Sequence, residues 1–372
     1  MVRLFQIALF IIGVLVPLQF SHAAGEKIPS LSFGRYLAVS ASLGEYFIVA
    51  GGGKPSQADP GHSDFVESIE VFDLKTLGWT VINTPTLALW NSGTRSAIIG
   101  TTIYFVGNRL YGDSIHAFDL RTQTFSSDTK IPWAYGAGIF SQGNLLSVIG
   151  GYVQTKPNIF VGSDAVNTWD TQLAKLSATM KLSKGRGDIC VATAGDRVLF
   201  GGGEDEGASN FSEVDILDAK TGRLGVTNLP GGGGKTQCAS DGHKAFFLNE
   251  NGQFDILELS SLAWQSPALP FSNEGRAMAF VEGKVLLAGG TDYKSDTDRI
   301  DIYEVSTGHW TTGALSMARA NISVASNGTQ VLFAGGTQIE NGNNKVKASV
   351  AVDLFDGRTG TWLSSKVEPS RF

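Results

Sequence analysis

The stretch Asp356 to Trp362, D-G-R-T-G-T-W, decides the fold, because it is the last of seven copies of one pattern. In each copy an acidic residue follows a short run rich in β-branched and aromatic residues, and a large apolar residue stands six positions after the acid. The acids are 40 to 52 residues apart along the chain. This regular spacing predicts repeated supersecondary units. The seven pairs are Asp73 with Trp79, Asp119 with Phe125, Asp170 with Leu176, Asp218 with Leu224, Glu258 with Trp264, Glu304 with Trp310, and Asp356 with Trp362.

Each unit carries a second signature, an apolar run that ends in paired glycines before the acid. Units two and five depart from it, since IYFVGN keeps only Gly107 and AFFLNE has Asn249 and Glu250 instead. Paired glycines are expected where the backbone has a positive φ or lies too close to a neighbour for a Cβ atom. The complete runs are FIVAGGG (47–53), LSVIGG (146–151), VLFGGG (198–203), VLLAGG (285–290) and VLFAGG (331–336).

An apolar run, a diglycine, an acid and a tryptophan in this order resemble the kelch repeat over roughly residues 33–365. The resemblance implies an all-β chain that forms one seven-bladed β-propeller of four-stranded blades around a central channel. Six blades with one aberrant unit are the alternative. The ring would close by packing, or by an extra strand from Ile28 to Phe33. The expected units are about 33–83, 94–130, 136–180, 186–228, 235–268, 276–315 and 319–365.

The first residues have the layout of a secretory signal peptide. Arg3 precedes an apolar run from Leu4 to Phe20, and small residues follow up to Ala24. We therefore expect a signal peptide over 1–24, a propeller over 25–372 and an extracellular, monomeric product with no membrane span in the mature chain. An uncleaved signal anchor is the alternative. The net charge of −6 argues against nucleic acid as a partner.

The chain has two cysteines and three N-x-S/T sequons. Cys190 and Cys238 stand eleven residues before the diglycine position of successive units, so an inter-blade disulfide is conceivable. Two separate buried thiols are the alternative. Asn210 in a variable loop and Asn327 at a hairpin tip are candidate glycosylation sites, whereas Asn321 should be shielded on an inner strand.

Basic residues recur just before the innermost strand of most units. The resemblance adds that kelch adaptors which capture acidic peptides bind them through arginines at corresponding positions. We therefore predict a basic ring around one mouth of the channel as the ligand-binding face. The alternative is that these side chains bond to neighbouring carbonyls or carboxylates and only fix the blades. The residues are Arg35, Arg95, Arg186, Lys235, Arg276 and Arg319.

No stretch of the sequence gives a complete catalytic motif. The run G-G-G-G-K-T (231–236) imitates the end of a phosphate-binding loop, but Leu229 stands where a glycine is needed and a strand-like run follows. A copper site like that of galactose oxidase needs converging histidines and tyrosines with a tyrosine beside a cysteine. The mature chain has four scattered histidines, at positions 62, 116, 243 and 309.

The sequence thus favours a secreted, non-catalytic binding or structural protein of the extracellular matrix or a cell surface, without metal or cofactor. Its partner would be a protein or an acidic glycan that binds the inter-blade loops. The alternative is a secreted or periplasmic carbohydrate-active enzyme, either a sugar isomerase or mutarotase or a relative of galactose oxidase. Sugar isomerases on kelch propellers place a few acids and bases in the central pocket, which no local motif reveals.

Overall fold

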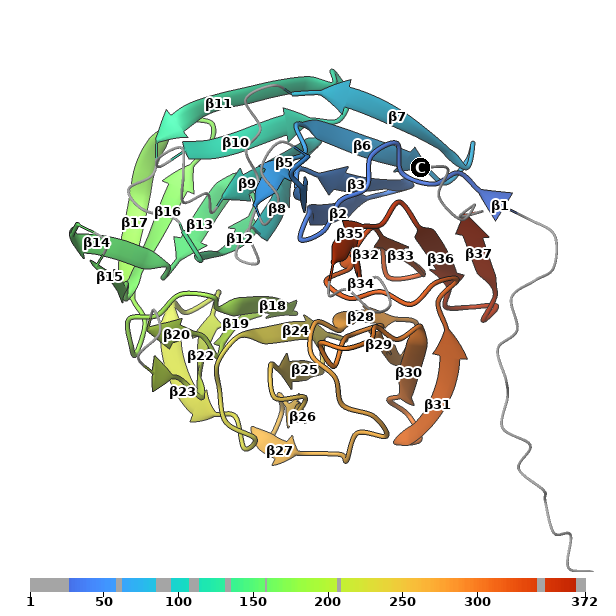
Figure 1. Cartoon of the computed structure of the whole chain (residues 1–372). Helices are drawn as coiled ribbons and strands as arrows, with labels where there is room; N and C mark the ends of the chain where they lie inside the picture. Colours follow the sequence, from blue (N-terminus) through green and yellow to red (C-terminus); the bar gives the residue numbers. More distant parts are fainter. Residues whose placement is uncertain are drawn as a thin grey trace, which may run out of the picture.

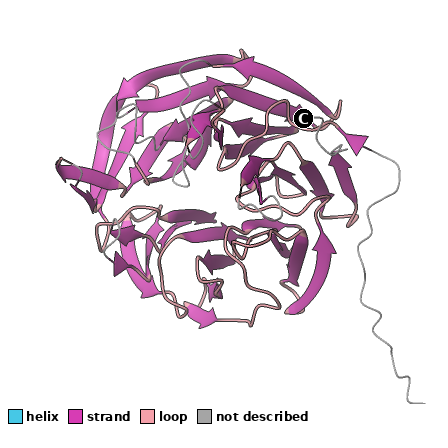
Figure 2. Cartoon of the chain, viewed as in Figure 1, coloured by secondary structure: helices cyan, strands magenta, loops and turns pink. Residues whose placement is uncertain are grey.

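The computed structural model describes residues 27–57, 62–84, 95–106, 114–130, 135–157, 159–205, 209–339 and 345–365. These residues form seven four-stranded antiparallel sheets around a channel, and the described part contains no helix (Figure 1, Figure 2). The prediction of an all-β, seven-bladed propeller is confirmed, and the six-bladed alternative is wrong. The predicted signal peptide, 1–24, lies outside the described residues. Within the described ranges no helix has the length and apolarity that a membrane span requires.

The blades follow one another along the chain, and each runs from its innermost to its outermost strand. Blade 1 consists of β2 (Val39–Leu43), β3 (Tyr46–Ala50), β6 (Ser68–Asp73) and β7 (Gly78–Asn83). Blade 2 consists of β8 (Arg95–Ile99), β9 (Thr102–Val106), β10 (Ser114–Asp119) and β11 (Thr124–Lys130). Blade 3 consists of β12 (Gly138–Gln142), β13 (Leu145–Ile149), β16 (Ala165–Asp170) and β17 (Lys175–Lys181). Blade 4 consists of β18 (Cys190–Ala194), β19 (Arg197–Gly201), β22 (Glu213–Asp218) and β23 (Arg223–Asn228).

The last three blades keep this order. Blade 5 consists of β24 (Thr236–Ser240), β25 (Lys244–Asn249), β26 (Phe254–Glu258) and β27 (Ala263–Gln265). Blade 6 consists of β28 (Ala277–Val281), β29 (Lys284–Ala288), β30 (Arg299–Glu304) and β31 (His309–Ala314). Blade 7 consists of β32 (Ser323–Ser326), β33 (Gln330–Ala334), β36 (Val352–Asp356) and β37 (Trp362–Ser365). Short hairpins leave four blades after the second strand: β4–β5 (Gly53–Pro55, Ser63–Phe65), β14–β15 (Tyr152–Lys156, Ile159–Gly162), β20–β21 (Glu204–Asp205, Ser209–Asn210) and β34–β35 (Thr337–Ile339, Val346–Ala348).

The recurring acid ends the third strand of each blade by binding the turn that follows it. Asp356 Oδ1 accepts the backbone N–H groups of Arg358 at 2.9 Å and Thr359 at 3.0 Å. The aromatic residue six positions on, Trp362, is 1% exposed and packs with Phe333 and Phe355 against residues of blade 6. The acid therefore shapes the turn, and the tryptophan fills the wedge between two blades.

The paired glycines lie where two blades touch through their backbones. A Cβ on Gly335 of blade 7 would overlap the carbonyl oxygen of Arg35 in blade 1, and Gly336 N–H donates to the same oxygen at 2.8 Å. Both glycines have positive φ, 67° and 110°. Side chains are excluded by this close approach as well as by the backbone angle. The same contact joins Gly150 and Gly151 to Arg186, and Gly289 and Gly290 to Arg319.

The segment that precedes blade 1 closes the ring. β1 (Lys27–Ile28) pairs in parallel with β37 and becomes a fifth, outermost strand of blade 7. Ile28 and Leu31 are buried between blades 7 and 1, and Trp79 Nε1 of blade 1 donates to the Pro29 carbonyl at 3.0 Å. An extra strand over Ile28 to Phe33 was one of the two expected ways to close the ring. Of these residues only Ile28 belongs to a strand. The residues after it lead to blade 1.

Serine hydroxyls join the innermost strands around the channel. Each donates to a backbone carbonyl of the neighbouring blade, so the inner strands are connected although they share no sheet. Between blades 4 and 5 a disulfide between Cys190 and Cys238 makes the corresponding connection. The serine bonds run from Ser40 to Val324, Ser42 to Ser326, Ser323 to Ala38, Ser96 to Ser40, Ser141 to Ile98 and Ser326 to Phe280.

Candidate functional site

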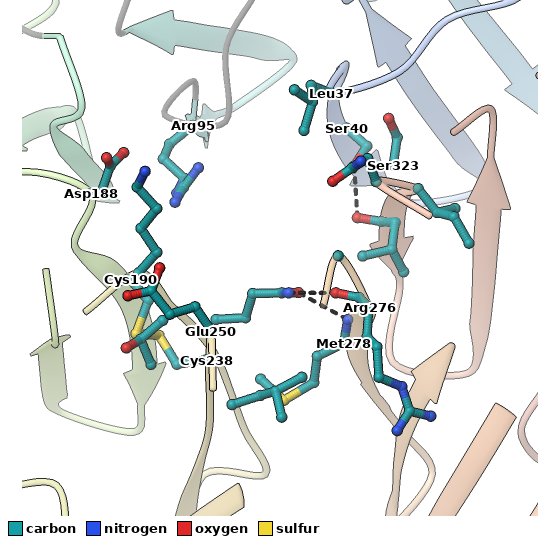
Figure 3. A pocket seen from close by; sticks show the side chains of 18 of the residues that line it. Leu37, Ser40, Arg95, Asp188, Cys190, Cys238, Glu250, Arg276, Met278 and Ser323 are labelled. Atoms are coloured by element: carbon teal, nitrogen blue, oxygen red, sulfur yellow. Dashed lines mark hydrogen bonds between the residues drawn. A yellow bond between two sulfur atoms is a disulfide. The ribbon is translucent and has the colours of Figure 1, made fainter. Parts of the chain in front are cut away.

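The channel opens into a cavity of about 730 Å³ at the end where the innermost strands begin. All seven blades contribute to its wall, which Figure 3 shows from close by. A cavity of this volume lies within the range of small-molecule sites. The polar side chains that line it decide which ligand it could hold.

Five blades have one residue with a left-handed backbone just before the innermost strand, and four of these residues, all except Gly136, line the cavity. The φ angles are 51° at Leu37, 65° at Gly136, 53° at Asp188, 65° at Gly275 and 52° at Asn321. Backbone bonds link neighbouring members: Leu37 N–H donates to Asn321 O, Asn321 N–H to Gly275 O, and Asp188 N–H to Gly136 O. We name these five residues the mouth ring. Asp188 is the ionisable member among them.

Asp188 is held in a buried cluster of polar groups. It is 7% exposed, and the hydroxyl of the buried Tyr152 lies 3.3 Å from its Oδ2 and 3.4 Å from Glu204 Oε1. Burial raises the pKa of Asp188, and the positive charges of Arg95 and Lys235 act against this rise. Burial and the two carboxylates also raise the pKa of Tyr152, so its phenol stays protonated and donates to them.

Two cations stand beside this cluster at the cavity wall. Arg95 is the first residue of β8 and is partly exposed, and Figure 3 shows it and Asp188 directed into the cavity. Lys235 precedes β24, is about half exposed, and places Nζ 3.3 Å from Glu204 Oε1. Burial acts to lower the pKa of Lys235, but the attraction of Asp188 and Glu204 prevails and raises it. Burial lowers the pKa of Arg95, but a guanidinium keeps its charge at neutral pH even so, and the Lys235 ammonium is charged as well.

The wall formed by blades 5 and 6 has the opposite character. Glu250 accepts a hydrogen bond from Asn210 Nδ2 at 3.1 Å, and Glu274 accepts one from the Tyr293 hydroxyl. Gln237 bridges to blade 6, where its Nε2 donates to the Arg276 carbonyl at 2.5 Å. Arg95 and Lys235 thus stand at the cavity wall beside the carboxyl of Asp188, and two further carboxylates, Glu250 and Glu274, line the wall of blades 5 and 6.

The structure places most of the predicted basic ring inside the blades. Arg35, Arg186 and Arg319 are 0% exposed and Arg276 is 3% exposed. Each pairs with a carboxylate on the third strand of its own blade, three residues before the turn acid. Their guanidinium groups are enclosed and do not form a surface around the channel. The pairs are Arg35 with Glu70 (2.5 Å), Arg186 with Asp215 (2.7 Å), Arg276 with Asp301 (2.8 Å) and Arg319 with Asp353 (2.6 Å).

Arg95 differs from Arg35, Arg186 and Arg319 because it stands at another place in its blade. It pairs with Val106 on β9, as Val39 pairs with Ala50 in blade 1. Arg95 therefore corresponds to Val39, four residues beyond Arg35. This register directs its side chain to the cavity. Arg95, which is partly exposed, and Lys235, which is about half exposed, are therefore the two members of the predicted ring that are not enclosed within a blade.

The structure also places the cysteine pair and the candidate glycosylation sites. Cys190 and Cys238 form a disulfide from β18 to β24 and both line the cavity. Asn210 is exposed and lies beside Glu250, whereas Asn327 at its hairpin tip accepts the N–H groups of Thr329 and Gln330. Glycosylation at either asparagine stays a prediction.

The other motifs find structural explanations. In G-G-G-G-K-T, a Cβ on Gly233 would overlap the Phe211 carbonyl, and Gly231 N–H donates to Asp255 at 3.1 Å, so this loop packs against the blades. His116 is buried and stacks on Phe125 at 5.5 Å, and burial lowers its pKa. Among the described residues no group of three His, Cys, Asp or Glu side chains is arranged to hold a metal ion.

Comparison with known proteins supports the propeller fold and does not identify a function. No protein-family model and no curated protein matches the chain. Among solved structures 1403 chains match, which is too broad a set to select a function. One of them, described as the structure of YjhT, has a TM-score of 0.54 and 14% sequence identity, and covers 91% of this chain and 99% of its own. At this identity the likeness shows a common propeller fold alone.

Sequence reasoning missed Tyr152, Asp188 and Glu204. A signal for Asp188 was present in three of the four units that carry a buried arginine. They read R-Y-L (35–37), R-G-D (186–188) and R-A-N (319–321), so the third residue changes its chemistry while the first is constant. Tyr152 and Glu204 follow the diglycine in successive units, where nothing in the sequence indicates that they meet Asp188.

Proposed function

We propose that this protein is an exported, kelch-type binding module that holds an acidic glycan by a carboxylate at the mouth of its channel. The observation that carries the proposal is the position of Arg95 and Lys235, two partly exposed cations on the wall of one cavity in a chain of net charge −6. The apolar N-terminal run and the disulfide support export, since disulfides persist in oxidising compartments.

The two cations suit a carboxylate ligand in different ways. The planar guanidinium of Arg95 can donate two parallel hydrogen bonds to one carboxylate, whereas the Lys235 ammonium is a compact charge on a flexible stem. Because they project from blades 2 and 5, a ligand that meets both lies over the channel. The concave wall strengthens their field relative to a flat surface.

Isothermal titration with acidic and neutral oligosaccharides of equal length tests this function. Arg95→Ala and Lys235→Ala should each weaken binding of the acidic sugar about 10-fold or more, since hydrogen bonds to charged groups contribute ~1.5–3 kcal/mol. Added salt should weaken the wild-type affinity. Lys220→Ala is the matched control, because Lys220 lies on a blade 4 turn and pairs with Asp196 in solvent. Equal binding of neutral and acidic sugars would contradict the proposal.

A carbohydrate-active enzyme is the second candidate, and the Tyr152–Asp188 contact favours it. A carboxyl whose pKa is raised by burial and a phenol held protonated can act as an acid and base pair beside a cavity. Polarimetry or NMR of anomerically pure sugars incubated with the protein tests this. Turnover that disappears in Asp188→Asn would replace the binding proposal by an enzymatic one.

A further inference from the structure

We infer that Asp188 makes the site selective for ligands in which a hydroxyl group lies close to the carboxylate, as in uronic acids. The site rejects carboxylates that lack such a hydroxyl group. The inference rests on the proposed function, because it concerns the same pair of cations. It assigns the role of a specificity-determining residue to Asp188, which faces the cavity between blades 2 and 5.

The charges around Asp188 decide which ligands can approach it. Side chains from four blades face Asp188: Arg95 from blade 2, Tyr152 from blade 3, Glu204 from its own blade and Lys235 from blade 5. An incoming carboxylate that is attracted by the two cations also meets the Asp188 carboxyl. Two carboxylates at close range repel each other unless a proton donor lies between them. A ligand hydroxyl next to the ligand carboxylate would supply this donor.

The Asp188 carboxylate can accept more hydrogen bonds than it receives from Tyr152. An ionised carboxylate offers about four acceptor positions. In the described part of the chain Tyr152 donates to Oδ2 at 3.3 Å, and its single proton is shared with Glu204. Acceptor capacity therefore remains on the side that faces the cavity. A hydroxyl that donates to a carboxylate makes one of the stronger classes of hydrogen bond.

The fold does not require an acid at the position of Asp188. The mouth ring has a positive φ throughout, yet blade 1 has Leu37 and blade 7 has Asn321 at the corresponding place. The backbone thus accepts an apolar side chain and an amide at equivalent positions. If Asp188 is replaced, Tyr152 still has Glu204 as an acceptor, so the cluster keeps a hydrogen bond. The carboxyl of Asp188 is therefore available for a role toward a ligand.

The experiment is a deoxy scan of one acidic sugar. The methyl glycoside of glucuronic acid and its 2-, 3- and 4-deoxy analogues are titrated into wild type, Asp188→Leu and Asp188→Asn. In wild type, one deoxy analogue should bind about 10-fold or more weakly than the parent. In Asp188→Leu this difference should vanish, and that analogue should bind more tightly than it does to wild type. Asp188→Asn keeps an acceptor without the charge and should retain a smaller difference.

Asp196→Leu is the matched control, since it makes the same change from a carboxylate to leucine on a turn of the same blade, where Asp196 pairs with Lys220 in solvent and does not line the cavity. It should leave the order of the four sugars unchanged. Equal binding of all four sugars to wild type, or a difference that survives in Asp188→Leu, overturns the role of Asp188 while the anion site stands. If the parent sugar does not bind wild type at all, the proposed function fails together with the inference.

Discussion

At the scale of single residues, Asp188 combines a left-handed backbone with burial of an ionisable group. Burial raises its pKa above the value of ~3.9 for an unperturbed aspartate. The folded protein therefore holds this proton more tightly than the unfolded chain. The stability that results is complete below the unfolded pKa and is lost as the pH rises through the folded pKa.

We therefore expect the free energy of unfolding of wild type, relative to Asp188→Leu, to be highest near pH 4 and to decrease toward neutral pH. Leucine at this position does not titrate, so the comparison isolates the carboxyl. Urea denaturation of both proteins at several pH values measures the difference. A difference that is constant with pH, or that increases, would show that the carboxyl is ionised at little cost.

The buried arginines stabilise the blades through their pairs with buried carboxylates. Arg319→Ala should lower the free energy of unfolding by ~3–5 kcal/mol, because it leaves Asp353 buried without its partner. Arg358→Ala removes an exposed pair with Glu282 and should cost at most ~1 kcal/mol. Chemical denaturation gives both values. Similar effects of the two substitutions would refute the structural role assigned to the buried pairs.

At the scale of elements, blade 5 departs furthest from the sequence pattern, since it keeps neither glycine, and the disulfide joins it to blade 4. Its second strand ends at Asn249, which Glu250 follows, where other blades have glycines. Lys235 is about half exposed and lies two residues before Gln237, which pairs with Leu248 as Val39 pairs with Ala50, whereas the buried Arg35 lies four residues before Val39. The bond from Cys190 to Cys238 joins its inner strand to blade 4, at the place where serines act elsewhere. A covalent link thus replaces the contacts that blade 5 lacks.

Loss of this disulfide should therefore cost more than loss of a serine bond. Replacing both cysteines by serine should lower the free energy of unfolding by ~2–4 kcal/mol. Ser326→Ala, which removes one inner-strand bond to Phe280, should cost about 0.5–1.5 kcal/mol. Thermal melting with and without reductant, for wild type and both variants, provides the test. A wild-type melting temperature that is insensitive to reductant would contradict this role.

The elements also show which features the sequence could predict. Asp356 binds N–H groups two and three residues ahead. Because this contact is local, the sequence pattern around the acid predicts each blade. Arg186 and Asp215 are 29 residues apart, and their pairing depends on strand register. Blade 2 lacks the second glycine that would have fixed its register, and Arg95 was therefore grouped with arginines that it does not match. Tyr152 and Asp188, 36 residues apart, meet only because adjacent blades converge at the channel.

At the scale of the whole molecule, the ring depends on a short segment outside the repeats. Ile28→Ala should lower the free energy of unfolding by ~2–5 kcal/mol, because Ile28 is 2% exposed between the first and last blades. Val81→Ala on the outer strand of blade 1, where the side chain is 38% exposed, should change it by no more than ~0.5 kcal/mol. Equal effects of the two substitutions, measured by denaturation, would mean that β1 contributes little to closure.

The pairing of β1 with β37 also imposes an order of events on a newly made chain. Blades 1 to 6 can each form from consecutive strands as they emerge, since their pairings are local. β1, which is synthesised first, has no partner until the ribosome has delivered the last strand. Until then Ile28, Leu31 and the facing side of blade 1 remain uncovered. The nascent chain thus carries an adhesive apolar edge for nearly the whole of its synthesis, and any product that stops short of β37 keeps that edge permanently.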